Sequence, residues 1–507
     1  MGKVLNMIQR YEYVKRAAQE SELKPWQRVY TNRNLKLDTV THMGFDMDHT
    51  LAVYHEKLEK LAFDLSIKEL VSKFGYDQKI LDFEYEYGGV IRGLVVDKVR
   101  GNVIKLDTHK YVEIAYHGEK RLTRDERKVI YAKPGESYRP DGDEYRYLDT
   151  LFCLPEAYLF LRMVSFIDET EGQREDYTQL ASEIRTSIDT IHRNGSLKKE
   201  IADNINSYVN KSAQLAKTLH HFIQGGKKLF LLTNSEYYFT DLVLTHLLSN
   251  ELSEYTRWQD YFEIIVVSSR KPGFFLKDTE MESIKVDELG VKISKDVSYK
   301  VFRGGYYAKI EELIGSSGEN IMYFGDHTFG DILKSKQTCG WRTAMIIEEL
   351  EKELKTIDSH KDKNAKLSGM RGELYDLQEE LHLYEEKIHS LRDRKIDCFD
   401  DLTKKELENM DIKISESQCI LSQLEIQLSE TVWKIKSLEE ELLEDYNPKW
   451  GCLFKSSRRK SRLGDQVEDF ACVYTSSITN FYYYPTTKYY RISRDLMAHE
   501  RYDSNSY

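Results

Sequence analysis

The segment Met43-Gly44-Phe45-Asp46-Met47-Asp48-His49-Thr50 reads as the end of a buried strand that opens into a loop with two carboxylates. Side chains alternate along a strand, so Asp46 and Asp48 should leave the strand end on the same side. They would then be close enough to share a metal ion and a phosphate. The hydroxyl of Thr50 follows two residues later. This spacing suits phosphoryl chemistry.

The physical case for this segment is that phosphate-monoester hydrolysis is among the slowest uncatalysed reactions. A metal-held anionic nucleophile helps the attack on phosphorus, and a proton donor helps the leaving oxygen to depart. We expect Asp46 to attack phosphorus and to bind the cation. Asp48 would protonate the leaving oxygen and later activate water, while Thr50 would hydrogen-bond the loop. The alternative is a solvated turn, because the chain has 85 acidic residues and short motifs match by accident.

Two later apolar runs end in groups that suit a phosphate. Residues 228–232 lead to small hydrogen-bonding side chains, which are Thr233, Asn234 and Ser235. Residues 262–267 lead to Lys271, whose positive charge can face both a phosphate and the Asp46 carboxylate. Taken singly, the first segment would be a helix cap and the second a turn.

A third apolar run, residues 321–324, leads to Asp326 and Asp331. Carboxylates here can complete a magnesium site, because this hard cation takes oxygen ligands. We therefore expect Mg²⁺ to be held by Asp46, Asp48 and Asp326, with Asp331 in a supporting position. All these segments follow apolar runs, and ligand sites of open α/β sheets lie at the carboxyl ends of strands.

At these residues the chain resembles the haloacid-dehalogenase-like (HAD) phosphatases, and Asp48 points to the phosphatase branch. Longer segments are similar to the cytosolic purine 5'-nucleotidase family; they are residues 44–54 (GFDMDHTLAVY), 92–107, 232–241, 270–275 and 325–336. The resemblance runs from about Tyr30 to Glu500. It implies magnesium-dependent hydrolysis of purine nucleoside monophosphates through an aspartyl-phosphate, with transfer of the phosphoryl group to a nucleoside as a related activity.

The resemblance also implies where the purine base binds. Phe152 would stack on the base, Arg185 and Asp189 would hydrogen-bond its edge, and Lys198 would reach the nucleotide. An acceptor at Asp189 would favour IMP and GMP over AMP, whose N1 carries no proton. His192 lies on the same helical face as Arg185 and Asp189, at spacings of four and three residues. Without the resemblance, this Arg/Asp pair would be an ordinary surface salt bridge.

The family enzyme is typically an ATP-activated tetramer, so we expect a homo-oligomer, either a dimer or a tetramer. Arg139, Phe329 and Gln466 match positions that line its effector site. Asp149 and Gln337 stand where the family has Asn and Lys. Gaining a carboxylate and losing a cation both weaken the attraction for a triphosphate, so we expect weaker activation by ATP or none.

The distance between residues 50 and 233 is far more than a crossover between parallel strands requires, so a cap must lie between them. A cap would exclude water and select the leaving group. Alternating residues from Gly88 to Ala115 predict a small antiparallel β insert. Residues 340–347 read as the last strand of the core.

The expected fold class is α/β, with a Rossmann-like parallel-sheet core of the HAD type, a helix-rich cap, the β insert and a long C-terminal helical hairpin. The boundaries that we expect are 30–117 for the first part of the core with the insert, 118–215 for the cap, 216–350 for the second part of the core, 365–448 for the hairpin and 449–507 for a segment that packs on the core or on a partner subunit.

Apolar residues recur at three- and four-residue spacing through the hairpin, with gaps at Ser417 and Thr431. This pattern predicts helices over 371–395 and 404–445 in an antiparallel coiled coil. The second helix would outrun the first. Its uncovered apolar surface would then need another subunit or the core.

Composition narrows the function further. The chain has 507 residues, enough for two or three domains, and 40% are hydrophobic. Its net charge of -11 (74 basic against 85 acidic residues) argues against non-specific nucleic-acid binding. No apolar run reaches the roughly 20 residues of a membrane helix. Six scattered cysteines without a CxxC pair, and no secretory signal pattern, favour a cytoplasmic protein that binds neither nucleic acid nor membrane.

Other functions remain open from sequence. The phosphatase core could be a platform for an interaction protein whose hairpin binds partners. The substrate could also be a different small phosphomonoester. The intact set of phosphatase segments favours an enzyme over a platform.

Overall fold

The computed structural model describes residues 22–131, 142–170, 176–284, 300–398, 402–457 and 459–492. Arg139 and the last fifteen residues of the C-terminal segment therefore lie outside the described part of the chain. Two compact units are present. One unit comprises Met1–Leu354 and Cys452–Tyr507, and the other comprises Lys355–Gly451.

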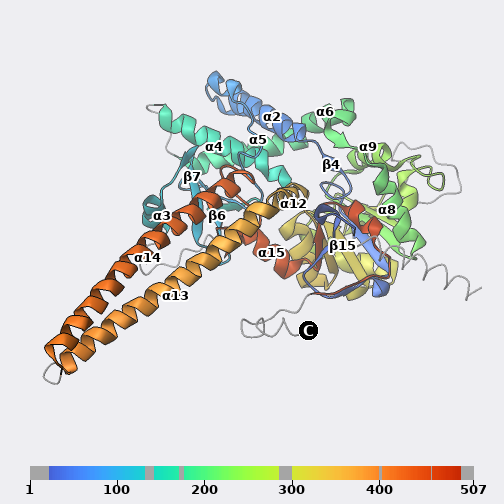
Figure 1. Ribbon diagram of the computed structural model, residues 1–507. Coiled ribbons are helices and arrows are strands. Elements are labelled where there is room, and N and C mark those ends of the chain that lie inside the picture. Colours follow the sequence, from blue (N-terminus) through green and yellow to red (C-terminus); the bar gives the residue numbers. More distant parts are fainter. Residues whose placement is uncertain are drawn as a thin grey trace, which may run out of the picture. The chain divides into compact units, whose positions relative to one another are not determined.

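The larger unit is organised around a nine-stranded sheet (Figure 1). In order across the sheet, its strands are β1 (Tyr30–Thr31), β19 (Val473–Thr475), β16 (Arg342–Ile346), β15 (Ile321–Gly325), β3 (His42–Phe45), β11 (Lys228–Leu232), β12 (Ile264–Val267), β14 (Lys300–Gly304) and β13 (Met281–Ser283). Neighbouring strands run parallel except at the two edges, where β1 and β13 are antiparallel. The prediction of an α/β fold with a mainly parallel sheet is confirmed.

The central strands are apolar because helices and loops cover both faces of the sheet. All residues of β3, β12 and β15 are buried. Aromatic rings fill much of one face, where Phe45 stacks on Phe324 with centroids 4.8 Å apart and Phe222 of α8 (Ala213–Gln224) lies next to both. The sequence pattern of short continuous apolar runs is the direct result of this burial.

The prediction that residues 340–347 form the last strand of the core was wrong. That strand is β16, but β19 pairs with it in parallel and β1 then pairs with β19. Both added strands are two or three residues long, which is too short for the hydrophobic period to identify. The C-terminal segment therefore contributes a strand to the main sheet.

Helices surround this sheet, and those from α2 to α8 lie in the chain between β3 and β11. They are α2 (Lys57–Phe74), α4 (Leu154–Glu169), α5 (Tyr177–Arg193), α6 (Ser196–Asp203), α7 (Ile205–Tyr208), α8 (Ala213–Gln224), α9 (Tyr237–Leu248), α10 (Gly273–Leu276), α11 (Tyr307–Ile314), α12 (Glu349–Ser359) and α15 (Arg462–Phe470). α2 packs against α4 and α5. The helical layer next to the strand ends therefore begins before residue 118.

A second sheet of five antiparallel strands lies in the same unit. Its order is β8 (Lys120–Arg121), β7 (Val112–His117), β6 (Asn102–Leu106), β5 (Val95–Asp97) and β9 (Tyr145–Tyr147), with α3 (Arg124–Tyr131) between β8 and β9. The strands expected between Gly88 and Ala115 are part of it. A domain boundary at residue 117 would divide this sheet, because β8 and β9 lie beyond that point.

Three short strand pairs complete the larger unit. β4 (Val53–Tyr54) pairs with β10 (Val209–Asn210), β2 (Leu35–Lys36) with β20 (Tyr489–Tyr490), and β17 (Lys455–Ser456) with β18 (Arg459–Lys460). The β4–β10 pair fastens the segment after Thr50 to the chain just before α8.

The smaller unit is a hairpin of α13 (Lys361–Asp397) and α14 (Lys404–Glu444). Ion pairs from Lys363 to Glu441 and from Arg371 to Glu439, each 2.7 Å, set the two helices antiparallel. The helices have 37 and 41 residues, so the second outruns the first as expected, but by a much smaller margin, because the first is longer than predicted. α13 begins before residue 371 because Leu367 is buried and continues the apolar seam.

Among the described residues, none of the helices combines the length and the apolar character that a membrane-spanning segment requires.

Gly44 tests how tightly β3 is packed. A Cβ atom on this residue would lie 2.2 Å from the ring of Phe230 on the neighbouring strand β11. We therefore expect Gly44→Ala to lower the free energy of unfolding by about 1–3 kcal/mol, the usual effect of overpacking a core. Denaturant unfolding of the full chain measures this. Gly273→Ala is the control, because nothing lies within 4 Å of its added Cβ; equal midpoints for the two variants would contradict the prediction.

Candidate active site

Four neighbouring parallel strands bring the sequence-predicted segments to one edge of the main sheet. These strands are β15, β3, β11 and β12, and their carboxyl ends meet at the same edge. Asp326 follows β15, Asp46 follows β3, and Thr233 follows β11. Lys271 comes from the loop after β12. Residues separated by up to 280 positions in the sequence thus share one site.

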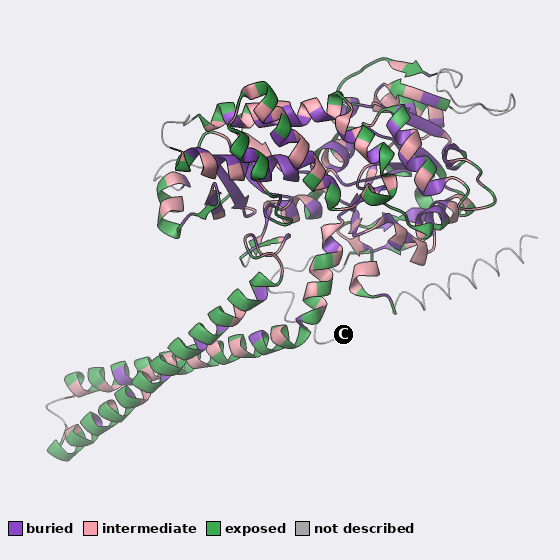
Figure 2. Ribbon diagram, turned by 90° about the horizontal axis from the view of Figure 1, so that it is seen from above, coloured by how far each residue is buried: buried purple, intermediate pink, exposed green. Residues whose placement is uncertain are grey.

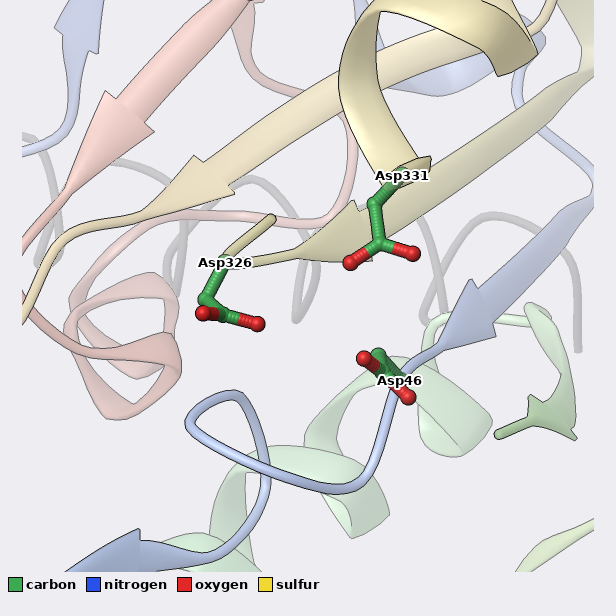
Figure 3. A group of neighbouring side chains, drawn as sticks. All are labelled: Asp46, Asp326 and Asp331. Carbon is green, nitrogen blue, oxygen red and sulfur yellow. The ribbon is translucent and has the colours of Figure 1, made fainter. Parts of the chain in front are cut away.

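Asp46, Asp326 and Asp331 form a buried acidic group (Figure 3). Each offers one carboxylate oxygen, and these oxygens all lie within 4.8 Å of one another. Asp331 is held by the wide π-helical turn η8 (Thr328–Leu333), and its Oδ2 accepts a hydrogen bond from the main-chain N–H of His327 at 3.2 Å. A donor set made only of carboxylate oxygens fits a hard divalent cation such as Mg²⁺.

Lys271 is the cation that faces this acidic group. Its Nζ lies 3.0 Å from Asp46 Oδ1 and 2.7 Å from Asp331 Oδ1. The side chain is only 3% exposed, and Nζ also donates to the Tyr323 hydroxyl at 2.8 Å. Buried charges must be paired to be tolerated. One lysine among three carboxylates leaves excess negative charge that a divalent cation would balance.

Burial sets the protonation of the acidic group. It raises the pKa of Asp46 to about 6, in spite of the neighbouring Lys271. It raises the pKa of Asp326 to about 7, which His49 and Arg92 oppose. For Lys271, burial acts to lower the pKa, but Asp331 and Asp46 outweigh it and the pKa is raised. Lysine therefore stays charged while the carboxylates are poised to exchange protons near neutral pH.

Asp48 lies in different surroundings from Asp46. Its Oδ1 accepts a hydrogen bond from the Tyr54 hydroxyl at 2.5 Å and its Oδ2 accepts one from Ser235 Oγ at 2.7 Å. Burial and the nearby Asp46 raise the pKa of Asp48. This carboxyl group is thus arranged to hold and release a proton. It is outside the acidic group of Asp46, Asp326 and Asp331, and its role as a metal ligand stays a prediction.

Asn234 fixes the loop that carries Lys271. Its Oδ1 accepts hydrogen bonds from the main-chain N–H of Lys271 at 2.6 Å and from Ser269 Oγ at 2.9 Å. Its Nδ2 donates to the Lys271 carbonyl at 3.1 Å. Thr233 Oγ1 accepts from the main-chain N–H of Ser235 at 3.1 Å. The predicted substrate contacts of Asn234 and Ser235 stay predictions.

Phe152 lies beside the loop after β3. It comes from the short turn η4 (Leu151–Cys153), and its ring meets His49 edge-on at 4.6 Å and His192 at 6.2 Å. Lys198 approaches from α6, and its Nζ pairs with Glu236 Oε2 at 3.0 Å, one residue after Ser235. The structure therefore brings Phe152, His192 and Lys198 towards the carboxyl-end loops of the sheet.

Arg185 and Asp189 pair with each other on α5 at 2.7 Å. Both side chains are partly exposed, at 44% and 41%. Arg185 Nη1 also donates to Glu156 at 3.0 Å, and Glu156 Oε1 forms an ion pair with Arg146, whose Nε lies 2.8 Å away. Sequence reasoning missed Arg146 and Glu156, because they come from β9 and α4 and no local spacing connects them with α5. The predicted contact of Arg185 and Asp189 with a base stays a prediction.

Thr50 is buried, and its main-chain N–H donates to the Met47 carbonyl at 3.3 Å. Its Oγ1 has no hydrogen-bond partner among the described residues. The expected side-chain hydrogen bond to the loop is therefore not formed there.

Arg92 is a site residue that sequence reasoning did not single out. Its side chain is fully buried, with Nη1 donating to the main-chain oxygen of Asp326 at 2.9 Å. Its Nε and Nη2 both donate to the carboxylate of Glu349 at the start of α12. Thr150 adds a hydrogen bond to Asp326 Oδ2 at 3.0 Å. Nothing local to Arg92 signals this contact, since Asp326 lies far along the chain.

His49 was also missed. Its Nδ1 lies 3.0 Å from Glu348 Oε1. Burial acts to lower the pKa of His49, but the Glu348 carboxylate outweighs burial and the pKa rises to about 9. The loop therefore carries a cationic ring directly after Asp48, in edge-on contact with Phe152.

Asp149 is one of the two positions at which we expect weaker binding of the effector ATP, and its side chain already has a hydrogen-bond partner within the chain. Asp149 Oδ1 accepts a hydrogen bond from Arg462 Nη1 at 3.2 Å. The response to ATP stays a prediction.

Comparison with known proteins agrees with this geometry. A family model described as the 5' nucleotidase family matches residues 29–502. A 5'-nucleotidase domain-containing protein of Dictyostelium discoideum is 28% identical over 480 residues, which cover 94% of this chain and 75% of that protein. 5'-nucleotidase domain-containing protein 2 of Rattus norvegicus is 28% identical over 346 residues, which cover 65% of this chain and 61% of that protein.

The raised carboxyl pKa values predict that cation binding is coupled to proton release. Below about pH 6 the Asp46 and Asp326 carboxyls are largely protonated, and a divalent cation must displace those protons. We expect the affinity for Mg²⁺ to rise between about pH 5.5 and pH 8. Titration calorimetry in two buffers of different ionisation enthalpy should show protons released near pH 6.5. Asp326→Asn should lose most of this release, and a pH-independent affinity would contradict the prediction.

Arg92 should matter for cation affinity. In Arg92→Lys, one ammonium cannot bind both Glu349 oxygens and the Asp326 main-chain oxygen at once. We expect the cation dissociation constant to rise about 10–100-fold, the usual effect of losing a group that orients a ligand. Lys105→Met is the control, because Lys105 is also buried but donates to the main-chain oxygen of Cys452. Unchanged cation binding in Arg92→Lys would show that Arg92 does not position Asp326.

Proposed function

The chain belongs to the 5' nucleotidase family and is an enzyme of that class, and from this premise we propose that it hydrolyses purine nucleoside 5'-monophosphates with Mg²⁺, preferring IMP and GMP. The observation that carries this proposal is the buried arrangement of Lys271 at 3.0 Å from Asp46, with Asp326 and Asp331 next to them. A nucleophile, a fixed positive charge and oxygen ligands for a cation are the three parts that phosphoryl transfer needs.

Asp46 is the nucleophile in this proposal. Its Oδ1 accepts hydrogen bonds from the main-chain N–H of Met47 at 2.8 Å and from Lys271, so we assign the attack on phosphorus to Oδ2. The new bond joins this oxygen to phosphorus, and the bond from phosphorus to the nucleoside O5' breaks. An aspartyl-phosphate and a nucleoside result.

Asp48 moves the protons. Its raised pKa supports a protonated carboxyl in the first step, which gives its proton to the leaving O5' atom. In the second step the carboxylate takes a proton from a water molecule, which attacks phosphorus and frees Asp46. Tyr54 and Ser235 hold the carboxyl in place through both steps. A nucleoside hydroxyl that replaces water at this point gives the related phosphotransferase activity.

The remaining predicted site residues bind the phosphate. We assign the phosphate contacts to Lys271 and the hydroxyl of Thr233, which come from the loops after β12 and β11, and Asn234 and Ser235 would support them through their hydrogen bonds to the same loops. We assign Asp46, Asp48 and Asp326 as the residues that hold Mg²⁺, with Asp331 near Lys271 and Thr50 in the loop. When bound, the cation neutralises charge on the phosphate oxygens.

The residues that we propose for base binding come from η4, α5 and α6, which follow β3 in the chain. Phe152 would stack on the purine, Asp189 would accept the N1–H of a 6-oxopurine, and Arg185 and His192 would be further contacts of the base. Lys198 would reach the nucleotide. AMP lacks a proton at N1, so a carboxylate there would disfavour it. The edge-on contacts of Phe152 with His49 and His192 support a base site next to the catalytic loop.

The proposal includes the architecture and the cellular setting. We propose a core of the HAD type formed mainly by residues 30–117 and 216–350, and a cap mainly at 118–215 whose strands β8 and β9 complete the five-stranded sheet. We also propose a coiled-coil hairpin at 365–448 and a C-terminal segment at 449–507 that packs on the core. We propose a cytoplasmic homo-oligomer. All six cysteines are free, which agrees with a reducing compartment.

A nucleotide panel tests the function. Phosphate release is measured from IMP, GMP, AMP and UMP, with Mg²⁺ and with a chelator. We expect IMP and GMP to be turned over fastest, and only with the cation, because Asp189 discriminates against AMP. Asp46→Asn is the control, and it should lose turnover because the amide is not a nucleophile. Absent turnover of IMP and GMP, or rates equal to those of AMP and UMP, would remove the purine assignment; an active Asp46→Asn enzyme would remove the nucleophile assignment.

A further inference from the structure

The helix α14 carries a second apolar stripe that faces away from α13. Its members are Ile412, Cys419, Ile426 and Trp433, each seven residues after the last. Ile412, Ile426 and Trp433 are 57%, 61% and 68% exposed, and Cys419 is exposed as well. The seam with α13 uses a different set of residues that are buried; they are Met410, Ser417, Leu424, Thr431, Ile435 and Leu442. Figure 2 shows how much of the outer face of the hairpin is exposed.

The strict seven-residue repeat of this outer stripe has a physical meaning. A straight helix has 3.6 residues per turn, so a line of residues spaced by seven drifts around it. Such a line stays in contact with a neighbour only when the two helices supercoil around each other. The stripe from Ile412 to Trp433 is about 32 Å long at 1.5 Å per residue. Single exposed apolar residues are common, but a regular line of this length indicates a partner helix.

Small residues accompany the outer stripe with the same period. Ser415, Ser422 and Ser429 each follow an apolar member by three residues, and all three are exposed. A spacing of three and then four residues is the pattern of the two contacting positions of a coiled coil. One contacting position is therefore large and the other is small. A partner must offer small residues opposite the large ones and large residues opposite the small ones.

We propose that the outer stripe of α14 pairs with the outer stripe of a second copy of this chain, in an antiparallel arrangement. In this pairing Trp433 of one copy meets Ser415 of the other, Ile426 meets Ser422, and Cys419 meets Ser429. The two residue numbers of each pair add to the same total. This is the condition for all three layers to form in a single register when two copies of one helix pair antiparallel. A two-fold axis makes every layer occur twice.

A parallel pairing of two copies does not fill space in this way. It sets Trp433 against Trp433 and serine against serine, so crowded layers alternate with empty ones. Protein interfaces pack as densely as protein interiors. The alternation of large and small positions thus selects the antiparallel copy.

Charges beside the stripe do not select an orientation. Ile412 has Asp411 and Lys413 on its two sides, and Trp433 has both Glu430 and Lys434 near it. Asp411 pairs with Lys395 in its own chain, and Lys434 and Lys436 have partners on the same helix at 3.9 Å. The fit of large side chains against small ones therefore decides the orientation.

Sedimentation velocity of the full chain tests the surface. We expect the wild-type chain to associate with increasing concentration. Trp433→Lys and Ile426→Lys should each raise the dissociation constant at least about tenfold, because each places a charge in the apolar contact of the pairing. Leu383→Lys on α13 is the matched control, since it is 62% exposed but lies off the stripe. It should associate like the wild type.

Cross-linking tests the register. In Ser429→Cys the new thiol lies opposite Cys419 of the other copy, so mild oxidation should give a disulfide-linked dimer on a non-reducing gel. Ser415→Cys carries the same substitution at an equivalent position whose partner is Trp433, and it should give no more linked dimer than the wild type. A wild-type chain that stays monomeric, lysine variants that associate as well as the wild type, or equal cross-linking of the two cysteine variants would each overturn the proposal.

Discussion

The ion pairs of Lys271 with Asp46 and Asp331 determine how the loops of the site are arranged. Removing these charges from water is costly, and only close pairing with further hydrogen bonds repays it. The Tyr323 hydroxyl accepts one such bond from Lys271 and donates its own hydrogen bond to the Leu232 carbonyl at 2.9 Å. The amide of Asn234 then fixes the main chain of Lys271 on both sides. The loops after β3, β11, β12 and β15 are thereby locked to one another through a single buried ammonium.

Asp46 and Asp48 show how two neighbouring carboxylates acquire different chemistry. Asp46 faces a lysine and other carboxylates, whereas Asp48 faces two hydroxyl groups. Strand alternation was the wrong basis for placing them, because β3 ends at Phe45 and both aspartates lie in the turn beyond it. That turn passes through His49, which has a φ of 52° in the left-handed region. The strained backbone is compensated by the bond of His49 to Glu348 and by its contact with Phe152.

The parts of the fold that sequence reasoning predicted are those with a local physical signal. Apolar runs identified β3, β11, β12 and β15, and the polar residues after them identified the site, because parallel strands end at one edge. The short edge strands β1 and β19 have no such signal and exist only because β16 lies next to them. Arg92 and Glu156 were missed for the same reason. The tertiary fold brings their partners to them, and no residue spacing within their own segments predicts these contacts.

In the hairpin, some polar residues are buried between the helices while large apolar residues are exposed, which is the opposite of the usual arrangement of a two-helix seam. Ser417 and Thr431 are buried between α13 and α14, while Ile426 and Trp433 are exposed on the outer face. A hairpin with no further partner would gain by exchanging these sets, because apolar residues stabilise when they are buried and not when they face water. The small polar residues between the two helices let α13 approach closely, but they bury little apolar surface and so weaken this seam. The large apolar side chains lie on the opposite face of α14. The distribution is what a helix shared between two seams requires, with neither seam strong enough to bury everything alone.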